Sequence, residues 1–129
     1  MDVLKKFDNL YFVVGRSLLG LYFIFPALGK IFDFMATLTL MRLKGVPFAL
    51  VLLPITITIQ LLGGIFLIFG HNLRLTSIVL FGLTITINVY IHNFWGLLDD
   101  PSYAHEVQNF YKNLGVAAGL LVLATKDKN

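Results

Sequence analysis

The stretch Arg16–Lys30 reads RSLLGLYFIFPALGK, and it decides the fold of this chain. It lies in an apolar run over residues 10–31, and a helix needs roughly 20 residues to cross the hydrocarbon core of a membrane. The run also carries an arginine in its first third and a lysine at its end. A charge at such a depth is costly and usually faces the interior of a helix bundle. The stretch therefore predicts a membrane helix with a polar inner face.

Composition extends this interpretation to the whole chain. Of 129 residues, 57% are hydrophobic and 13% are charged, and the mean hydropathy is +0.82. Soluble domains are about 45–50% apolar and about 25% charged, so we expect one membrane-embedded domain over residues 1–129. The chain has 0 cysteines, which excludes a disulfide, a thiolate metal site and a cysteine nucleophile. A net charge of +3, scattered along the chain, does not indicate nucleic-acid binding.

Three further apolar runs predict membrane helices over residues 48–69, 74–95 and 109–125. The β-branched residues 84–87 resemble a strand, but a lone strand in lipid would leave its backbone polar groups unpaired. Met35, Leu38, Met41 and Arg42 recur at helical spacing, which indicates a short amphipathic helix at the membrane interface. The sequence thus predicts an all-α integral membrane protein. Its four transmembrane helices form a bundle, with the interfacial helix between helices 1 and 2.

The distribution of basic residues predicts the orientation. Four spans place both ends on one side, together with five basic residues: Lys5, Lys6, Arg74, Lys126 and Lys128. The other side carries Arg42 and Lys44, once Lys30 and Lys112 are set aside as intramembrane groups. The positive-inside rule then places both ends in the cytoplasm. A cleavable signal peptide is the alternative for the first run, since two lysines precede its apolar core.

Polar residues within the spans are the candidate site. In an antiparallel bundle they could line one polar pocket, reaching from Arg16 at depth to His92 and Lys112 near the outer surface. The candidate residues are Arg16, Lys30, Gln60, Asn88, His92, Trp95, Lys112 and Asn113. Each also has a structural alternative, in which the side chain only joins helices or reaches the interface. No carboxylate lies inside the spans, and no metal-ligand spacing occurs, so the sequence predicts neither proton coupling nor a metal site.

Glycines indicate where helices approach closely. Gly63 and Gly64 form a pair inside the second span, and Gly115 and Gly119 form a G-x-x-x-G pattern in the fourth. Such spacing lets another helix come near. For Gly115 and Gly119 we favour packing within the chain over a dimer contact.

In this order the motifs resemble the DoxX family of small four-helix membrane proteins. The matching residues are Arg16, Gly20, Phe23, Gly29-Lys30, Gly45-x-Pro47, Gly63-Gly64, Gly70, Arg74, His92-x-Phe94-Trp95, Phe110-x-Lys112-Asn113-Leu114 and Gly119. The resemblance implies a bacterial inner-membrane protein, and some relatives are named as parts of quinone-linked or thiol-stress oxidoreductase systems. One departure is Gln60, where the family often has a glutamate.

Four functions remain open at this stage. The first is an accessory or anchoring subunit that docks a partner redox enzyme and holds a quinone headgroup near Arg16, His92, Trp95 and Lys112. The second is a small transporter or permeability protein acting as a homo-oligomer in the lipid bilayer. The third is a membrane enzyme in its own right, and the fourth is a structural or assembly role. We expect the first, because a bundle this small and free of cysteine cannot do redox chemistry without a cofactor or a partner.

Overall fold

The structure, a computed structural model, describes residues 2–126 and builds them almost entirely from helices. In chain order the elements are α1 (Asp2–Lys5), α2 (Asp8–Phe32), α3 (Phe34–Leu43), α4 (Ala49–Phe69), α5 (Leu73–Tyr90), the 3-10 helix η1 (Phe94–Gly96) and α6 (Tyr103–Leu123). No strand occurs within the described residues. The all-α prediction is therefore confirmed.

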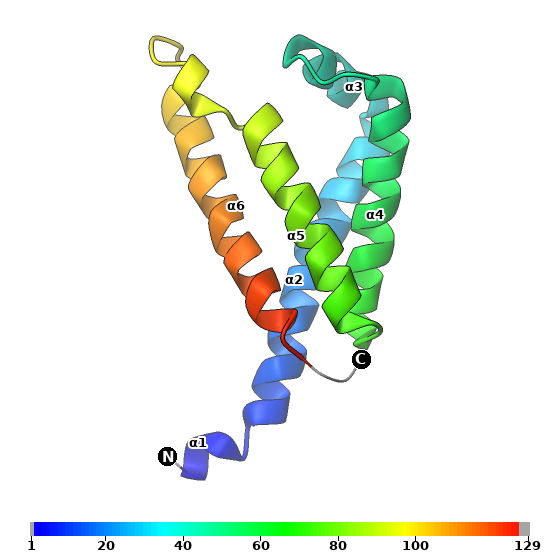
Figure 1. Ribbon diagram of the computed structural model, residues 1–129, viewed down its shortest axis with the longest axis vertical. Helices are drawn as coiled ribbons and strands as arrows, with labels where there is room; N and C mark the ends of the chain where they lie inside the picture. The colour runs from blue at the N-terminus through cyan, green and yellow to red at the C-terminus, as the bar shows by residue number, and fades with distance from the viewer. Residues whose placement is uncertain (1, 127–129) are drawn as a thin grey trace.

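The long helices form two pairs, α2 with α4 and α5 with α6, which diverge toward the end that carries α3 (Figure 1). Near the opposite end, one apolar cluster joins all four helices through Phe23, Leu67, Leu73, Leu80, Leu120 and Leu123. At the α3 end, a second cluster of Ala27, Leu38, Ala49, Leu53 and Ile57 comes from α2, α3 and α4 alone. The space between the two pairs is therefore not filled by the apolar core at this end.

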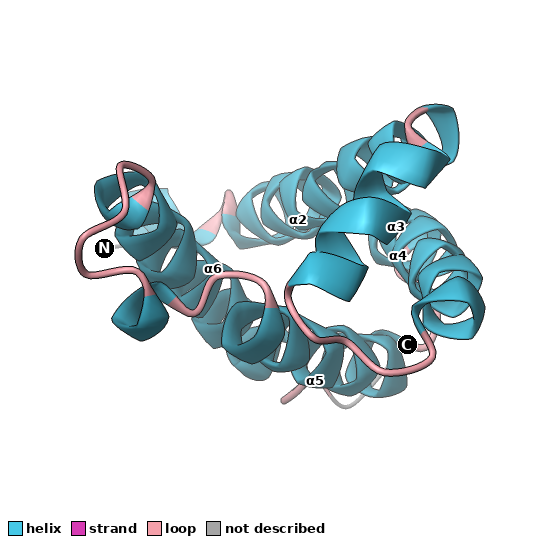
Figure 2. Cartoon of the chain, turned by 90° about the horizontal axis from the view of Figure 1, so that it is seen from above, coloured by secondary structure: helices cyan, strands magenta, loops and turns pink. Residues whose placement is uncertain are grey.

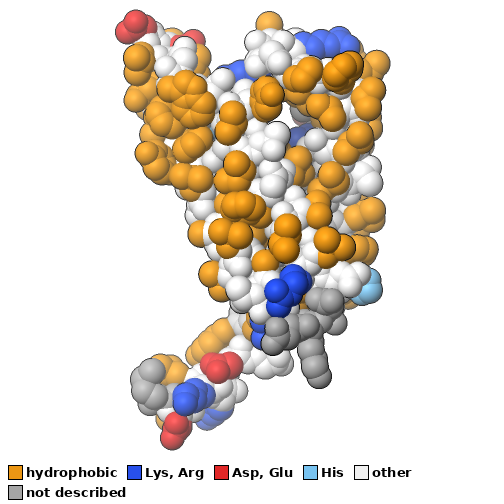
Figure 3. All heavy atoms as spheres, in the orientation of Figure 1, with side chains coloured by type: hydrophobic (Ala, Val, Ile, Leu, Met, Phe, Trp, Pro, Cys, Tyr) orange, Lys and Arg blue, Asp and Glu red, His pale blue; other side chains and the backbone are white. Residues whose placement is uncertain are grey.

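The surface of the molecule is apolar and part of its interior is polar. Leu18, Phe25 and Val122 are 62%, 65% and 73% exposed, whereas Gln60 and Asn88 are 4% and 1% exposed. Hydrophobic side chains cover the middle of the visible face, and charged ones gather near its two ends (Figure 3). This arrangement suits a protein whose outer surface is solvated by lipid.

Three segments within residues 2–126 are long and apolar enough to cross a membrane: Asp8–Phe32, Ala49–Phe69 and Leu73–Gly96. The last continues α5 through the turn into η1. Helix α6 is 21 residues long, but its first half carries several polar side chains that lower its hydropathy.

Helices α2 and α4 meet backbone to backbone at two glycines. A Cβ atom on Gly20 would lie 2.5 Å from the carbonyl oxygen of Gly64, and one on Gly64 would lie 2.6 Å from that of Gly20. Both distances are shorter than any real Cβ contact, so neither position admits a larger residue without moving a helix. The preceding residue, Gly63, faces α5 instead, where its Cβ would lie 3.0 Å from the side chain of Leu80.

The side chain of Arg16 caps the C-terminal end of α4. Its Nε donates a hydrogen bond to the carbonyl oxygen of Leu67 at 3.0 Å, and Nη2 lies 3.5 Å from that of Ile68. These carbonyls belong to the last turn of α4, where the intrahelical donors run out. The helix ends at Gly70, which adopts the left-handed conformation (φ 74°). A cation there satisfies the orphan acceptors and complements the negative end of the helix dipole.

The predicted boundaries of the third and fourth helices, 74–95 and 109–125, differ from those observed. Helix α5 ends at Tyr90, and the chain turns before η1, because the ring of Phe94 packs against Tyr103 and Phe110 at centroid distances of 6.0 and 5.2 Å. Helix α6 begins six residues earlier than predicted, at Tyr103. In the turn before it, Asp100 accepts hydrogen bonds from the backbone N–H and the hydroxyl of Ser102, at 2.8 and 2.7 Å. These bonds hold the pKa of Asp100 below its ordinary value.

Helix α3 lies across the diverging end of the bundle (Figure 2). It packs on α4 and α2 and buries Leu38. The chain leaves it through Gly45, whose φ of 80° only glycine adopts readily. A short helix was expected around Met35, Leu38, Met41 and Arg42, and α3 contains all four residues. It covers the space between α2, α4 and α5.

Candidate functional site

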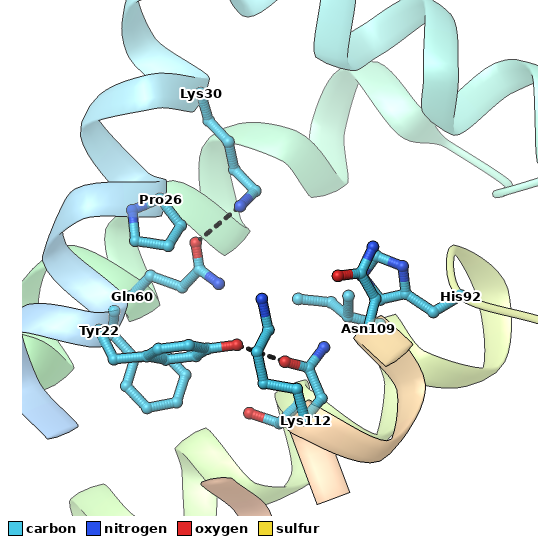
Figure 4. A pocket seen from close by; sticks show the side chains of 11 residues that line it. Tyr22, Pro26, Lys30, Gln60, His92, Asn109 and Lys112 are labelled. Atoms are coloured by element: carbon cyan, nitrogen blue, oxygen red, sulfur yellow. Dashed lines mark hydrogen bonds between the residues drawn. The ribbon is translucent and has the colours of Figure 1, made fainter. Parts of the chain in front are cut away.

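A polar cavity of about 240 Å³ lies between α2, α4, α5 and α6 (Figure 4). It is lined by Tyr22, Phe23, Pro26, Lys30, Gln60, Thr84, Ile87, His92, Asn109, Lys112 and Asn113. By comparison, an engineered apolar cavity of about 150 Å³ binds benzene. The cavity therefore has room for a ring with substituents.

Lys30 and Gln60 form the wall on the side of α2 and α4. The ammonium of Lys30 donates a hydrogen bond of 3.1 Å to Oε1 of Gln60. Lys30 lies in the last turn of α2, one turn beyond Pro26, and Gln60 is buried in α4. Because an ammonium has three donors, this bond leaves two of them directed elsewhere.

A chain of hydrogen bonds crosses between the two helix pairs. The hydroxyl of Tyr22 donates to Oδ1 of Asn113. Nδ2 of Asn113 donates to Oδ1 of Asn88 at 3.0 Å, and Nδ2 of Asn88 donates to the carbonyl oxygen of Phe110 at 3.0 Å. Each amide thus both accepts and donates, which fixes its orientation. The chain joins α2, α6 and α5, and it satisfies two buried amides that would otherwise destabilise the bundle.

Glu106 organises the mouth of the cavity without lining it. Its carboxylate accepts a hydrogen bond from Asn109 at 3.1 Å, lies 3.3 Å from Nδ1 of His92 and pairs with Lys44 at 3.8 Å. Glu106 thus connects the end of α3 to the first turn of α6 and to the turn after α5.

Lys112 extends its ammonium into the cavity, toward the space between Tyr22 and Gln60 (Figure 4). Within residues 2–126, no hydrogen bond or ion pair engages it, and Lys30 has no ion pair. The cavity therefore holds two ammonium groups, and no carboxylate is among its lining residues.

A second, apolar cavity of about 640 Å³ adjoins the first, between α2, α3, α4 and α5. Its walls include Leu40, Met41, Leu53, Ile59 and Leu83. The two cavities share four lining residues: Pro26, Lys30, Ile87 and His92. Together they form a polar chamber that continues into a larger apolar one.

Five of the eight predicted site residues line the polar cavity: Lys30, Gln60, His92, Lys112 and Asn113. Asn88 lies next to it, bonded to Asn113. Arg16 does not line the cavity, because its guanidinium lies on the last turn of α4. Trp95 is 52% exposed and packs edge-on against Phe94 and Phe110 outside the cavity.

Of the four glycines predicted to pack against other helices, three face another helix and one does not. Gly63 and Gly64 lie at helix contacts, and Gly119 faces Leu19 of α2 at an ordinary distance of 3.7 Å. Nothing lies within 4 Å of a Cβ on Gly115.

Several cavity residues were missed from the sequence, notably Tyr22, Pro26 and Asn109. Helical spacing carried a signal for two of them, since Tyr22 and Pro26 precede Lys30 by two turns and one turn on the same face. Asn109 similarly precedes Asn113 by one turn of α6.

An all-helical chain with three apolar helices of spanning length and an apolar outer surface is an integral membrane protein. The family model for DoxX matches residues 11–93. The chain therefore belongs to the DoxX family.

Two curated relatives come from Escherichia coli (strain K12). The chain is 30% identical to inner membrane protein YqjF over 123 residues, covering 94% of this chain and 87% of that protein. It is 24% identical to inner membrane protein YphA over 129 residues, covering 96% and 91%. No solved structure matches the chain.

Proposed function

We propose that this chain is an accessory or anchoring subunit of a quinone-linked redox system in the bacterial inner membrane, and that it holds the quinone headgroup in the polar cavity. The observation that carries the proposal is the junction of the two cavities. A quinone has a polar ring and a long apolar tail. The polar chamber of about 240 Å³ suits the ring, and the apolar chamber of about 640 Å³ suits the start of the tail. Lys30 and His92 stand at the boundary between the two chambers.

The chemistry of the polar chamber supports this ligand. Quinone carbonyls accept hydrogen bonds, and the chamber offers ammonium donors from Lys30 and Lys112 and an amide donor from Gln60. The chain has 0 cysteines, so electron transfer would pass between the quinone and a partner protein. Its relatives YqjF and YphA are both named inner membrane proteins, which supports the membrane assigned here.

The topology of the proposal has four spans, with α6 as the fourth. At 1.5 Å per residue its 21 residues are about 32 Å long, which matches a hydrocarbon core of about 30 Å. Both α1 and the end of α6 lie away from α3 (Figure 1), as an even number of spans requires. We place these ends in the cytoplasm by the positive-inside rule, and α3 at the opposite interface. Because the chain has 0 cysteines, single cysteines at Ser102 and Lys6 can be labelled from either side to test this.

Binding of a short-chain quinone to the protein in nanodiscs tests the site. Gln60→Leu removes the acceptor of the Lys30 bond and a polar wall of the chamber. It should weaken binding about tenfold, because the quinone carbonyl loses the hydrogen bond that the amide of Gln60 would donate to it. Thr58→Val is the matched control on the same helix, because Thr58 is exposed and its hydroxyl donates to the backbone carbonyl of Pro54. No quinone binding by the native chain, or equal losses in both variants, would rule the site out.

Partner capture tests the accessory role. Gentle extraction from the native membrane followed by native mass spectrometry should recover a stoichiometric redox partner. A bare chain that carries flux in liposomes would instead establish the transporter alternative. For Arg16, the structure favours a stabilising role over ligand binding, because its donors are directed at the carbonyl groups of α4.

A further inference from the structure

The charge of the polar chamber narrows the class of quinone that it would take. Two ammonium groups, from Lys30 and Lys112, line the chamber, and its other lining residues are neutral amides, hydroxyls, an imidazole and apolar groups. No carboxylate lines it, and within residues 2–126 no ion pair involves either lysine. The lining of the chamber is thus cationic.

The nearest carboxylates do not supply a counter-charge to this lining. Glu106 is already engaged by His92, Asn109 and Lys44 at the mouth. Asp33 lines the apolar cavity rather than the polar one. Because unpaired charge inside a membrane is costly, and because two like charges in one chamber repel each other, an anionic group between the lysines would be stabilised.

We propose that the site takes an alkyl hydroxyquinone in its anionic form, in preference to a neutral quinone of the same size. This inference rests on the proposed function, since it assigns the ligand class of the same cavity. The ionised ring oxygen accepts hydrogen bonds from the uncommitted donors of Lys30 and from Lys112. The alkyl chain continues past Ile87 into the apolar chamber.

The test compares two probes with the same ring and chain, an alkyl hydroxynaphthoquinone and its methyl ether. Both are titrated against the protein in phosphatidylcholine nanodiscs, with empty nanodiscs as the blank for partitioning. The native chain should bind the hydroxyquinone about tenfold more tightly than the ether, as expected for charge-assisted hydrogen bonds. The ratio of the two affinities is the readout, because partitioning affects it equally in every variant.

Three variants identify the source of the preference. Lys112→Gln should lower the ratio several-fold, because it removes one of the two ammonium donors. The fold should be retained, since no hydrogen bond or ion pair engages Lys112 within residues 2–126. Lys112→Arg should retain the preference, since it keeps the charge. Lys6→Gln should also retain it, because Lys6 lies beside Phe7 at the N-terminal end of α2, outside the cavity.

The outcomes separate this inference from the proposed function. Equal binding of both probes by the native chain overturns the charge preference and leaves quinone binding standing. Binding of neither probe overturns both. Decanoic acid as a third probe should bind more weakly than the hydroxyquinone, because it lacks the ring that fills the polar chamber. Equal or tighter binding of the fatty acid overturns the hydroxyquinone assignment.

Discussion

Replacing Gly64 with alanine tests the contact that sets the distance between α2 and α4. The new Cβ would lie 2.6 Å from the carbonyl oxygen of Gly20 and 2.6 Å from Cγ1 of Ile24. Ordinary van der Waals contact begins at 3.4 Å, so the first distance falls short by 0.8 Å. The side chain of Ile24 can rotate away, but a helix carbonyl cannot, so the two helices must separate.

The free energy of unfolding should fall as a result. Adding a methylene to a packed interior costs about 1–3 kcal/mol, and exchanging glycine for alanine inside a helix returns about 1 kcal/mol. The backbone clash places Gly64→Ala at the upper end of that cost, so we expect a net loss of about 2 kcal/mol. Gly82→Ala is the control, because nothing lies within 4 Å of its Cβ. It should gain up to about 1 kcal/mol, since only the helix propensity changes.

Unfolding of the two variants in mixed micelles by denaturing detergent measures this contrast. The assay should report a difference of about 3 kcal/mol between Gly64→Ala and Gly82→Ala, the sum of the two expected effects. Equal stability of the two variants would refute the close crossing. Quinone binding by Gly64→Ala should weaken as well, because α2 and α4 both line the polar cavity.

Three further predictions concern the polar side chains. Arg16→Met should lower the free energy of unfolding by about 1.5–3 kcal/mol, the usual range for a hydrogen bond to a charged group. The quinone affinity of the folded variant should equal that of the native chain, and an altered affinity would contradict the capping role. Asn113→Leu should lower the free energy of unfolding by about 1–3 kcal/mol, because it leaves the buried amide oxygen of Asn88 without its hydrogen bond. Unchanged stability in the same detergent assay would mean that the buried chain of hydrogen bonds does not stabilise the fold. Glu106→Gln should lower the melting temperature, because it removes the charge that pairs with Lys44 at 3.8 Å and weakens the hydrogen bond accepted from Asn109 at 3.1 Å. An unchanged melting temperature in the same detergent would show that these contacts do not stabilise the fold.

The sequence predicted α2 and α4 to within about two residues, because each is an unbroken apolar run whose length alone indicates a membrane helix. It misplaced the end of α5, since Ile91 to Trp95 read as a continuation of the apolar run. The turn there depends on contacts of Phe94 with rings from α6, which lie more than eight residues away and leave no local signal. The start of α6 was missed because its first turns lie in a polar segment, which reads as part of the preceding loop.

The cavity was partly predictable because polar side chains are rare inside membrane helices. Lys30, Gln60 and Lys112 were found in this way. Tyr22 was missed because its ring reads as apolar, although its hydroxyl bonds to an asparagine. For Arg16, the depth of the residue within its span was not enough to predict its role. Its position along α2 predicted a buried charge but not its partner, which is set by where α4 ends.

The apolar chamber has a consequence for how a ligand would reach the site. Its lining includes Leu52, Ile55 and Tyr90, which are 36%, 47% and 41% exposed, so part of the chamber wall belongs to the surface of the molecule. In a bilayer that surface faces acyl chains, so a ligand would enter by lateral diffusion within one leaflet rather than from water. Its occupancy would then follow its mole fraction in the lipid and not its aqueous concentration. Diluting the ligand with additional vesicles at constant volume would empty the site, and a series of ligands would rank by their partition coefficients as much as by their fit to the chamber.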